Sequence, residues 1–499
     1  MNNTFHHSYY HHILLSTILI LFFILNILLP TWCCSCLRSD TLEEICIGNE
    51  WSLYCFCHPG LPTWINRFFW EIFNCSEYAP YLASRFCIAL DLLGLWFLAR
   101  IFLSPSKAII SVFSMLGYWY FNGGGLMLNH SMSVITCWIW SIYFFCRVLQ
   151  TEKNRYWIAL GIMLGLGLNC KYTAIILILS LLSYMFINPK ARTYWKTSGP
   201  WLTILSAILL FLPHLCSVLH RWEPIFAFIT RQKTVAESSF ILDMTTGWLI
   251  QLAIISPILL SLLPLFTFPF RREKISISSK NIPDHNILYF IFFTTLLFHF
   301  IFQCITGVAF PNRHYGSHLW TLLPIILLQG LQTVSTRWKW NLAFFWIIFF
   351  TIIEIITLPV MTWNASNYSA RPSERFYPGK AMAQEFDNIW HEVFPNTKCP
   401  YIATYNYRYG LMAICVYSQS QPHIVTHEGF YSSSKELNEK GGILIWCPDE
   451  KFPDNMISEE IKNEYPNAIF KGCKDFRYNQ KNPDVPSLKI AFALVPPTQ

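Results

Sequence analysis

Charged residues are scarce in this chain of 499 residues. Only 13% are Asp, Glu, Lys or Arg, whereas 53% are hydrophobic and 17% aromatic; ordinary soluble domains carry about 25% charged residues. The sequence lacks a P-loop and a G-x-G-x-x-G motif, which argues against an ATP-driven pump. It also lacks a basic stripe on a soluble segment, so the net charge of +7 does not indicate nucleic-acid binding.

Apolar runs long enough to cross a bilayer recur along most of the chain. The first run is too long for a signal-peptide core and is not followed by an A-x-A-like cleavage site, so we expect it to remain as a helix. Together the runs predict about eleven transmembrane helices, near residues 13–31, 80–100, 107–122, 131–149, 156–170, 172–188, 199–217, 246–268, 286–308, 317–335 and 340–361.

The distribution of Lys and Arg predicts the orientation of these helices. By the positive-inside rule, the connections that collect basic residues are cytoplasmic. The opposite face then carries the loop after the first helix, the loops 218–245 and 307–316, and everything after about residue 362. The basic connections alternate with these and contain Arg100 and Lys107, Lys153 and Arg155, Lys190, Arg192 and Lys196, Arg271, Arg272 and Lys274, and Arg337 and Lys339.

The composition changes to that of a soluble protein after Met361. Ala381 to Phe394 has helical periodicity, and three short strands are predicted at 402–405, 443–446 and 490–494. We therefore expect a transmembrane domain over residues 1–361 and a small extracytoplasmic α/β domain over residues 362–499. On an oxidising face, one or two disulfides are expected among the tail cysteines, with three pairings open; these are Cys399, Cys415, Cys447 and Cys473.

The loop after the first predicted helix combines carboxylates with an aromatic, proline-rich segment. Asp40 and Glu43 are one turn apart if their segment is helical, and charge at a membrane edge is usually functional. Residues 61–73 can form an amphipathic helix in the membrane interface, with Trp64, Phe68 and Phe69 toward lipid. This pattern favours a membrane enzyme acting on a lipid-linked substrate.

Several motifs, in this order and on these sides of the membrane, resemble the bacterial dolichyl-phosphate-mannose-type glycosyltransferases. These are polytopic enzymes of GT-C fold that include protein O-mannosyltransferases and the lipid A aminoarabinose transferase. The resemblance covers roughly residues 10–360. It is carried by D-T-L-E (Asp40 to Glu43), W-S-L-Y and H-P-G-L-P-T-W (Trp51 to Trp64), Arg85, L-N-H-S (Leu128 to Ser131), G-L-G-L-N-C-K-Y-T (Gly165 to Thr173) and P-N-R-H-Y-G (Pro311 to Gly316).

The resemblance implies inverting sugar transfer from a polyprenyl phosphate, which needs a base for the acceptor and cations for the leaving phosphate. Asp40 is the candidate base, with a helix cap or an interfacial charge as the structural alternative. Glu43 would orient the acceptor or raise the pKa of Asp40. The chain departs from the family at Pro59-Gly60, where two prolines are common, and at His130, where an acidic residue is common. Whether a divalent metal is bound stays open.

Six residues are candidates for binding the substrate or its phosphate. For Lys171, an equal alternative to phosphate binding is that its side chain extends to the lipid headgroups. For Arg85, the alternative is that it braces the first loop. The histidines are candidates for positioning the acceptor or ligating a metal, with a structural role as the alternative. The six are His58, Arg85, His130, Lys171, Arg313 and His314.

The sequence thus predicts a glycosyltransferase of the bacterial inner membrane, with a periplasmic active site. Its partners would be a polyprenyl-phosphate-linked sugar and an envelope acceptor, which is lipid A or lipopolysaccharide, another glycolipid, or protein. A transporter or flippase of lipid-linked sugar is the alternative from another class, and Glu354 inside the last helix fits it better. A non-catalytic homologue is a third reading.

Overall fold

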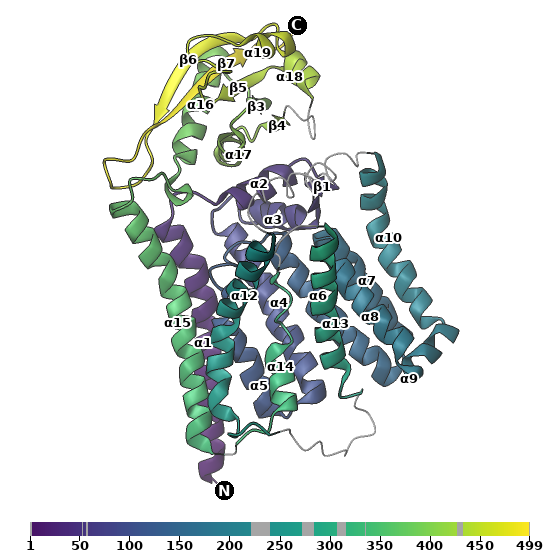
Figure 1. Cartoon of the computed structure of the whole chain (residues 1–499). Helices are drawn as coiled ribbons and strands as arrows, with labels where there is room; N and C mark the ends of the chain where they lie inside the picture. The colour runs from purple at the N-terminus through teal and green to yellow at the C-terminus, as the bar shows by residue number, and fades with distance from the viewer. Residues whose placement is uncertain are drawn as a thin grey trace. The chain divides into compact units, whose positions relative to one another are not determined.

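The computed structural model in Figure 1 describes residues 2–51, 53–55, 58–220, 240–271, 284–306, 316–334, 336–426 and 433–498. The chain divides into two compact units. The first, called here the membrane unit, comprises residues 1–27, 56–62 and 81–357. The second, called the tail unit, comprises residues 28–55, 63–80 and 358–499.

Helices build the membrane unit. Seven described helices are long and apolar enough to cross a membrane, or eight if a pair bent by 94° after Ile187 is counted as one span. The protein is therefore a multi-pass membrane protein. The helices are α1 (Asn2–Cys33), α4 (Ala79–Phe102), α5 (Pro105–Ser114), α6 (His130–Thr151), α7 (Asn154–Cys170), α8 (Ala174–Ile187), α9 (Pro189–Arg192), α10 (Gly199–His220), α12 (Phe240–Leu262), α13 (Ile287–Thr306), α14 (Leu323–Gly330) and α15 (Arg337–Asn367).

Each of the eleven apolar runs contains one described helix, but the number of spans is not confirmed. Four of the helices are short: α5 has 10 residues, α7 has 17, α8 has 14 and α14 has 8. At 1.5 Å per residue, the shortest of these covers only about 12 Å. Apolar composition alone therefore overstates how many helices reach across the hydrocarbon layer.

Small residues bring α7 and α10 together. Gly161 and Gly165 lie four positions apart on α7, and a Cβ at Gly165 would lie 2.9 Å from the carbonyl oxygen of Ala207 on α10. A Cβ at Gly161 would collide with the backbone of Thr203. This is the small-xxx-small pattern by which membrane helices pack closely.

The tail unit joins most of the loop after α1 to the chain after residue 358. Its helices and strands are α2 (Ser39–Gly48), α3 (Leu61–Ile72), α16 (Gly379–Val393), β3 (Tyr401–Thr404), α17 (Arg408–Tyr417), β4 (His423–Thr426), α18 (Ser434–Lys440), β5 (Gly442–Trp446), α19 (Glu459–Glu464), β6 (Ile469–Phe476) and β7 (Leu488–Val495). The predicted helix over 381–394 coincides with α16, and the three predicted strands coincide with β3, β5 and β7.

The five strands form one mixed sheet in the order β4-β3-β5-β7-β6. The first three are parallel, and β7 runs antiparallel to β5 and β6. One face is packed by α18 and α19, where Leu437 and Ile461 join a buried cluster with Trp446 of β5. On the other face Phe386 of α16 packs edge-on against Phe492 of β7, with 5.4 Å between ring centroids. The sheet therefore has helices on both faces.

The loop after α1, called here the first loop, is held to the tail by packing and by polar contacts. Helix α2 packs on α17, and Leu37 N–H donates to the Tyr417 hydroxyl (2.9 Å), which itself donates to Glu77 (2.8 Å). Arg67 of α3 pairs with Glu71 (2.7 Å) and donates to Gln421 (3.0 Å). By packing, the first loop thus belongs with the tail, so this unit is larger than the predicted domain 362–499.

The helix α3 and the cysteines of the tail were both subjects of a prediction. The amphipathic helix predicted over 61–73 is present as α3, and its Phe68 and Ile72 side chains are 54% and 57% exposed. The disulfide expectation is wrong, because the cysteines with described side chains, Cys399, Cys415, Cys447 and Cys473 among them, all carry free thiols.

The contact between Glu50 and His423 predicts a pH dependence of stability. Their atoms Oε1 and Nδ1 are 2.9 Å apart, and the hydrogen bond to Glu50 raises the pKa of His423. A raised histidine pKa stabilises the fold fully below the unfolded value of about 6.5 and loses this stabilisation as pH rises through the folded pKa. Because the pair is partly exposed, the effect is at most about 1 kcal/mol.

Thermal unfolding of the full chain in detergent, measured from about pH 6 to about pH 8, tests this. Relative to His423→Gln, the wild-type protein should lose stability as pH rises, and Glu50→Gln should behave like His423→Gln. Parallel curves for all three proteins would show that the pair does not contribute.

Candidate functional site

Lys171 lies in the break between α7 and α8. It has an extended backbone (φ −160°, ψ 135°), which ends α7 at Cys170. Its side chain is buried, with the residue 7% exposed, and its Nζ donates to Ser131 Oγ at 2.8 Å. Ser131 is in the first turn of α6, after the N-cap Asn129. The ammonium is thus turned into the helix bundle, which does not fit snorkelling toward solvent.

Two of the predicted histidines lie together beside this lysine. His130 Nε2–H donates to the carbonyl oxygen of Pro59 (3.2 Å), and the His58 and His130 rings are 4.5 Å apart between centroids. Burial lowers the pKa of His58 well below its usual value, and the charges of His130 and Lys171 add to this. The structure therefore brings His58, His130 and Lys171 into one polar region.

A second histidine pair was missed by sequence reasoning. His299 of α13 and His318, before α14, are joined Nε2 to Nε2 at 2.9 Å, so one ring donates and the other accepts. They are 2% and 1% exposed, and the His318 ring packs at 4.1 Å from Trp138. The available signal was the presence of both in apolar runs, since ionisable residues within membrane segments are usually functional.

These residues form one cluster in the membrane unit. The Lys171 ammonium is within electrostatic range of His58, His299 and His318. Ser317 Oγ donates to the Ser131 carbonyl oxygen (2.8 Å), which ties the segment before α14 to the start of α6. We call Lys171, His58, His130, His299 and His318 the lysine-histidine cluster.

The chemistry of this cluster suits an anion. An ammonium and imidazole N–H groups can all donate to phosphate oxygens. In a water-poor interior such charge-assisted contacts are stronger than in bulk water. Fixed donors of this kind stabilise negative charge that develops on a leaving group.

Arg85 of α4 has a different set of partners. Its guanidinium donates to the carbonyl oxygens of Phe121 (2.8 Å) and Gly125, and it stacks 5.9 Å from the Phe22 ring centroid. It therefore braces the segment 121–125, which contains the run of three glycines. Phosphate binding by Arg85 stays a prediction. Arg313 and His314 lie outside the described residues.

Asp40 and Glu43 belong to α2 of the tail unit. The segment is helical, so the two carboxylates are one turn apart as predicted. Asp40 is exposed and Glu43 is half-buried. The N-cap position is occupied by Arg38, so Asp40 is not the cap. Burial raises the pKa of Glu44 well above its usual value, with the Asp40 charge adding to this. Glu44 thus points into the unit and favours its neutral form, whereas Asp40 is accessible.

A metal site is not supported by the described part of the chain. Within it no group of three or more His, Cys, Asp or Glu residues lies close enough to hold an ion. The two histidine pairs do not combine into such a group. We therefore derive no chemical step through a metal.

A carboxyl side chain that sequence reasoning overlooked lies within α4. Asp91 is fully buried, and the charge of Arg85, six residues earlier, acts on it. Glu354 of α15 is half-buried. Carboxyl groups inside membrane helices are costly and often mark a transport pathway, so these two residues bear on the alternative function.

Comparison with known proteins gives a family-model match to part of the chain and a similarity of fold. Residues 57–216 match the family model described as dolichyl-phosphate-mannose-protein mannosyltransferase. No curated protein sequence matches the chain.

Similar solved structures include two of ArnT from Cupriavidus metallidurans. The one bound to undecaprenyl phosphate has a TM-score of 0.60 and 10% identity, over 98% of this chain and 99% of that chain. The apo state has a TM-score of 0.46 and 9% identity, over 99% and 100%. The apo oligosaccharyltransferase of Archaeoglobus fulgidus has a TM-score of 0.43 and 10% identity, over 95% and 76%. The predicted resemblance to the dolichyl-phosphate-mannose-type glycosyltransferases is thus confirmed, by the family model over residues 57–216 and by the GT-C fold over almost the whole chain.

Proposed function

We propose that the protein is an integral-membrane glycosyltransferase. It moves a sugar from a polyprenyl-phosphate donor to an acceptor of the bacterial envelope, on the periplasmic side of the inner membrane. The acceptor is lipid A or lipopolysaccharide, another glycolipid, or protein. The lysine-histidine cluster is the observation that carries this proposal. It is a buried set of nitrogen groups able to form hydrogen bonds with a phosphate, in a chain with the fold of ArnT.

The cluster supplies the phosphate side of the reaction. Lys171 Nζ is a compact positive charge at the end of a membrane helix, and it binds phosphate as a point charge rather than as a fork. Held against the donor phosphate, it stabilises the negative charge that grows as the sugar leaves. We assign the remaining oxygens of the phosphate to the imidazoles of His130 and His318, each acting through its other ring nitrogen.

The acceptor side needs a base. The acceptor oxygen attacks the anomeric carbon of the sugar, and its proton passes to the Asp40 carboxylate. The bond between this carbon and the phosphate oxygen breaks, and its electron pair stays on the departing polyprenyl phosphate. A single displacement of this kind inverts the anomeric configuration. Glu43, one turn along α2, is proposed to orient the acceptor.

A flippase of lipid-linked sugar is the second candidate. Asp91 and Glu354 favour it, because carboxyl groups within membrane helices serve transport pathways. Both candidates bind the same lipid phosphate, so binding alone does not separate them.

Sugar transfer by purified protein in detergent separates the two, since no transport is possible there. The assay presents a panel of synthetic polyprenyl-phosphate sugars with envelope-lipid and peptide acceptors. Transfer with inversion supports the glycosyltransferase. No transfer across the panel, together with movement of lipid-linked sugar across liposome membranes, would instead establish the flippase.

The proposed side of the membrane predicts the location of the C-terminus. The alternation of basic connections places Asp40 and the tail outside. An alkaline phosphatase fusion after residue 499 should therefore be active, whereas a cytoplasmic reporter at the same point should be silent. The opposite pattern would overturn the proposed side of catalysis.

The proposed base predicts the effect of Asp40→Asn. The variant keeps the shape of the side chain but cannot accept the proton, so transfer should fall by at least about 10²-fold. Glu43→Gln should cost less. Asp484→Asn, at an exposed aspartate of the same unit, is the matched control and should transfer normally. Wild-type turnover by Asp40→Asn in a folded protein would remove Asp40 from the mechanism.

A further inference from the structure

Two buried thiols meet where α2 packs on α17. Cys46 lies in the second half of α2 and Cys415 near the end of α17, and the two residues are 4% and 5% exposed. Their thiols are hydrogen-bonded to each other. The two cysteines are far apart in the chain, so the packing of the first loop on the tail is what brings their sulfur atoms into contact.

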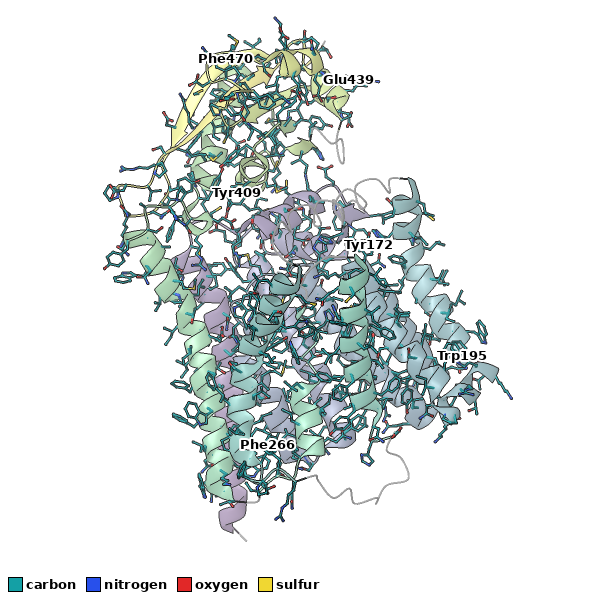
Figure 2. All side chains as sticks on the ribbon, viewed as in Figure 1. Tyr172, Trp195, Phe266, Tyr409, Glu439 and Phe470 are labelled. Atoms are coloured by element: carbon teal, nitrogen blue, oxygen red, sulfur yellow. The ribbon has the colours of Figure 1, made fainter. Side chains whose placement is uncertain are left out.

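Contacts on both sides of this thiol pair hold α2 in place against the tail. Before α2, the Tyr409 hydroxyl donates to the Leu37 carbonyl oxygen (3.3 Å); Figure 2 labels Tyr409, near the start of α17. After α2, Glu50 contacts His423 (2.9 Å), and the Glu50 charge also acts on Cys415. Because α2 is held at both ends, the two thiols stay opposite each other.

Two other thiols of the tail have backbone partners instead. Cys399 donates to the carbonyl oxygen of the start of β3, at 3.3 Å, and Cys473 donates to a carbonyl oxygen of the loop before α19, at 3.0 Å. Cys399 is within electrostatic range of Cys415, but its hydrogen bond turns its thiol toward its own segment. Of these thiols, Cys46 is therefore the one that faces Cys415.

We propose that Cys46 and Cys415 form a disulfide that links α2 covalently to α17. The inference rests on the proposed function, which places this unit on the periplasmic side, where disulfides form and persist. The structure holds the reduced form, in which both thiols are free. A disulfide brings its sulfur atoms to about 2 Å, and thiols already in hydrogen-bond contact reach this distance with a small movement of their side chains.

The bond forms by thiol–disulfide exchange, with the disulfide of an oxidoreductase or a small molecule as the oxidant. The thiolate of one cysteine attacks this disulfide, which gives a mixed disulfide and releases one thiol of the oxidant. The thiolate of the other cysteine then attacks the mixed disulfide, so the bond between Cys46 and Cys415 forms and the second thiol of the oxidant leaves. The pair loses two electrons and two protons, and the oxidant gains both.

Burial determines when this exchange proceeds. It raises the pKa of Cys415 well above its usual value, and the hydrogen bond to Cys46 adds to this. Because the thiolate is the reactive form, the exchange is slow once α2 lies on α17 and proceeds while the two helices are apart. After closure the sulfur atoms are shielded from a reductant. The bond then holds the helix that carries Asp40 against the tail.

Peptide mapping of the wild-type full chain tests this directly. Free thiols are blocked with iodoacetamide as the cells are lysed, and the purified protein is digested without a reductant. We expect the peptide of Cys46 joined to the peptide of Cys415, with a mass two hydrogen atoms below that of the two thiol peptides. Blocked thiols at both positions, or either cysteine joined to a different partner, would overturn the proposal.

Variants and a reductant then locate the bond. Cys46→Ser should lose the joined peptide and leave Cys415 blocked by iodoacetamide once the protein is unfolded, whereas the matched control Cys473→Ser should keep the joined peptide. A phosphine reductant should open the bond in unfolded wild-type protein and leave it closed in the folded protein. Equally fast reduction of the folded protein would place the bond outside the buried contact and overturn the proposal.

The same preparations separate this inference from the proposed function. Sugar transfer by protein in which both thiols are found free would overturn the disulfide and leave the glycosyltransferase standing. A joined peptide in protein that transfers no sugar across the panel of donors would keep the disulfide and overturn the glycosyltransferase.

Discussion

The proposed phosphate site depends on one buried ammonium. Lys171 is 7% exposed within a membrane unit, and burying a charge is costly unless polar groups or an opposite charge compensate. The groups described around it are the Ser131 hydroxyl and four imidazoles, which are polar groups with hydrogen-bonding nitrogens and oxygen. The break between α7 and α8 turns the Lys171 side chain toward the other residues of the lysine-histidine cluster. One local feature, the end of α7 at Cys170, therefore sets the position of the proposed phosphate ligand.

The proposed base depends on a different set of contacts. Asp40 lies on a short helix, α2, which packs on α17 of the tail. Leu37 is anchored on Tyr417, and Glu50 on His423. The tail thus holds in place the helix that carries the proposed base. Burial, together with the charge of Asp40, raises the pKa of Glu44 on the same helix well above its usual value.

Much of this could be predicted from periodicity and spacing. The D-x-x-E helix, the amphipathic α3 and the strands of the tail follow from local patterns that the structure keeps. The His299 and His318 pair could not be found in this way, because the two residues are 19 positions apart and meet only through the packing of α13. The backbone contacts of Arg85 were hidden for the same reason. Hydropathy also counted α14 as a span, although only 8 residues of its run are helical and residues 317–322 form turns.

The most direct measurement of the central claim is the affinity of the purified protein for undecaprenyl phosphate, followed by native mass spectrometry. Lys171→Met keeps the length of the side chain and removes the charge, so we expect binding to weaken by on the order of 10²-fold, the scale for losing a charge-assisted contact in a dry site. Lys153→Met, at an exposed lysine between α6 and α7, should bind as the wild type does. Equal affinity of Lys171→Met and the wild-type protein would contradict a lipid phosphate at Lys171.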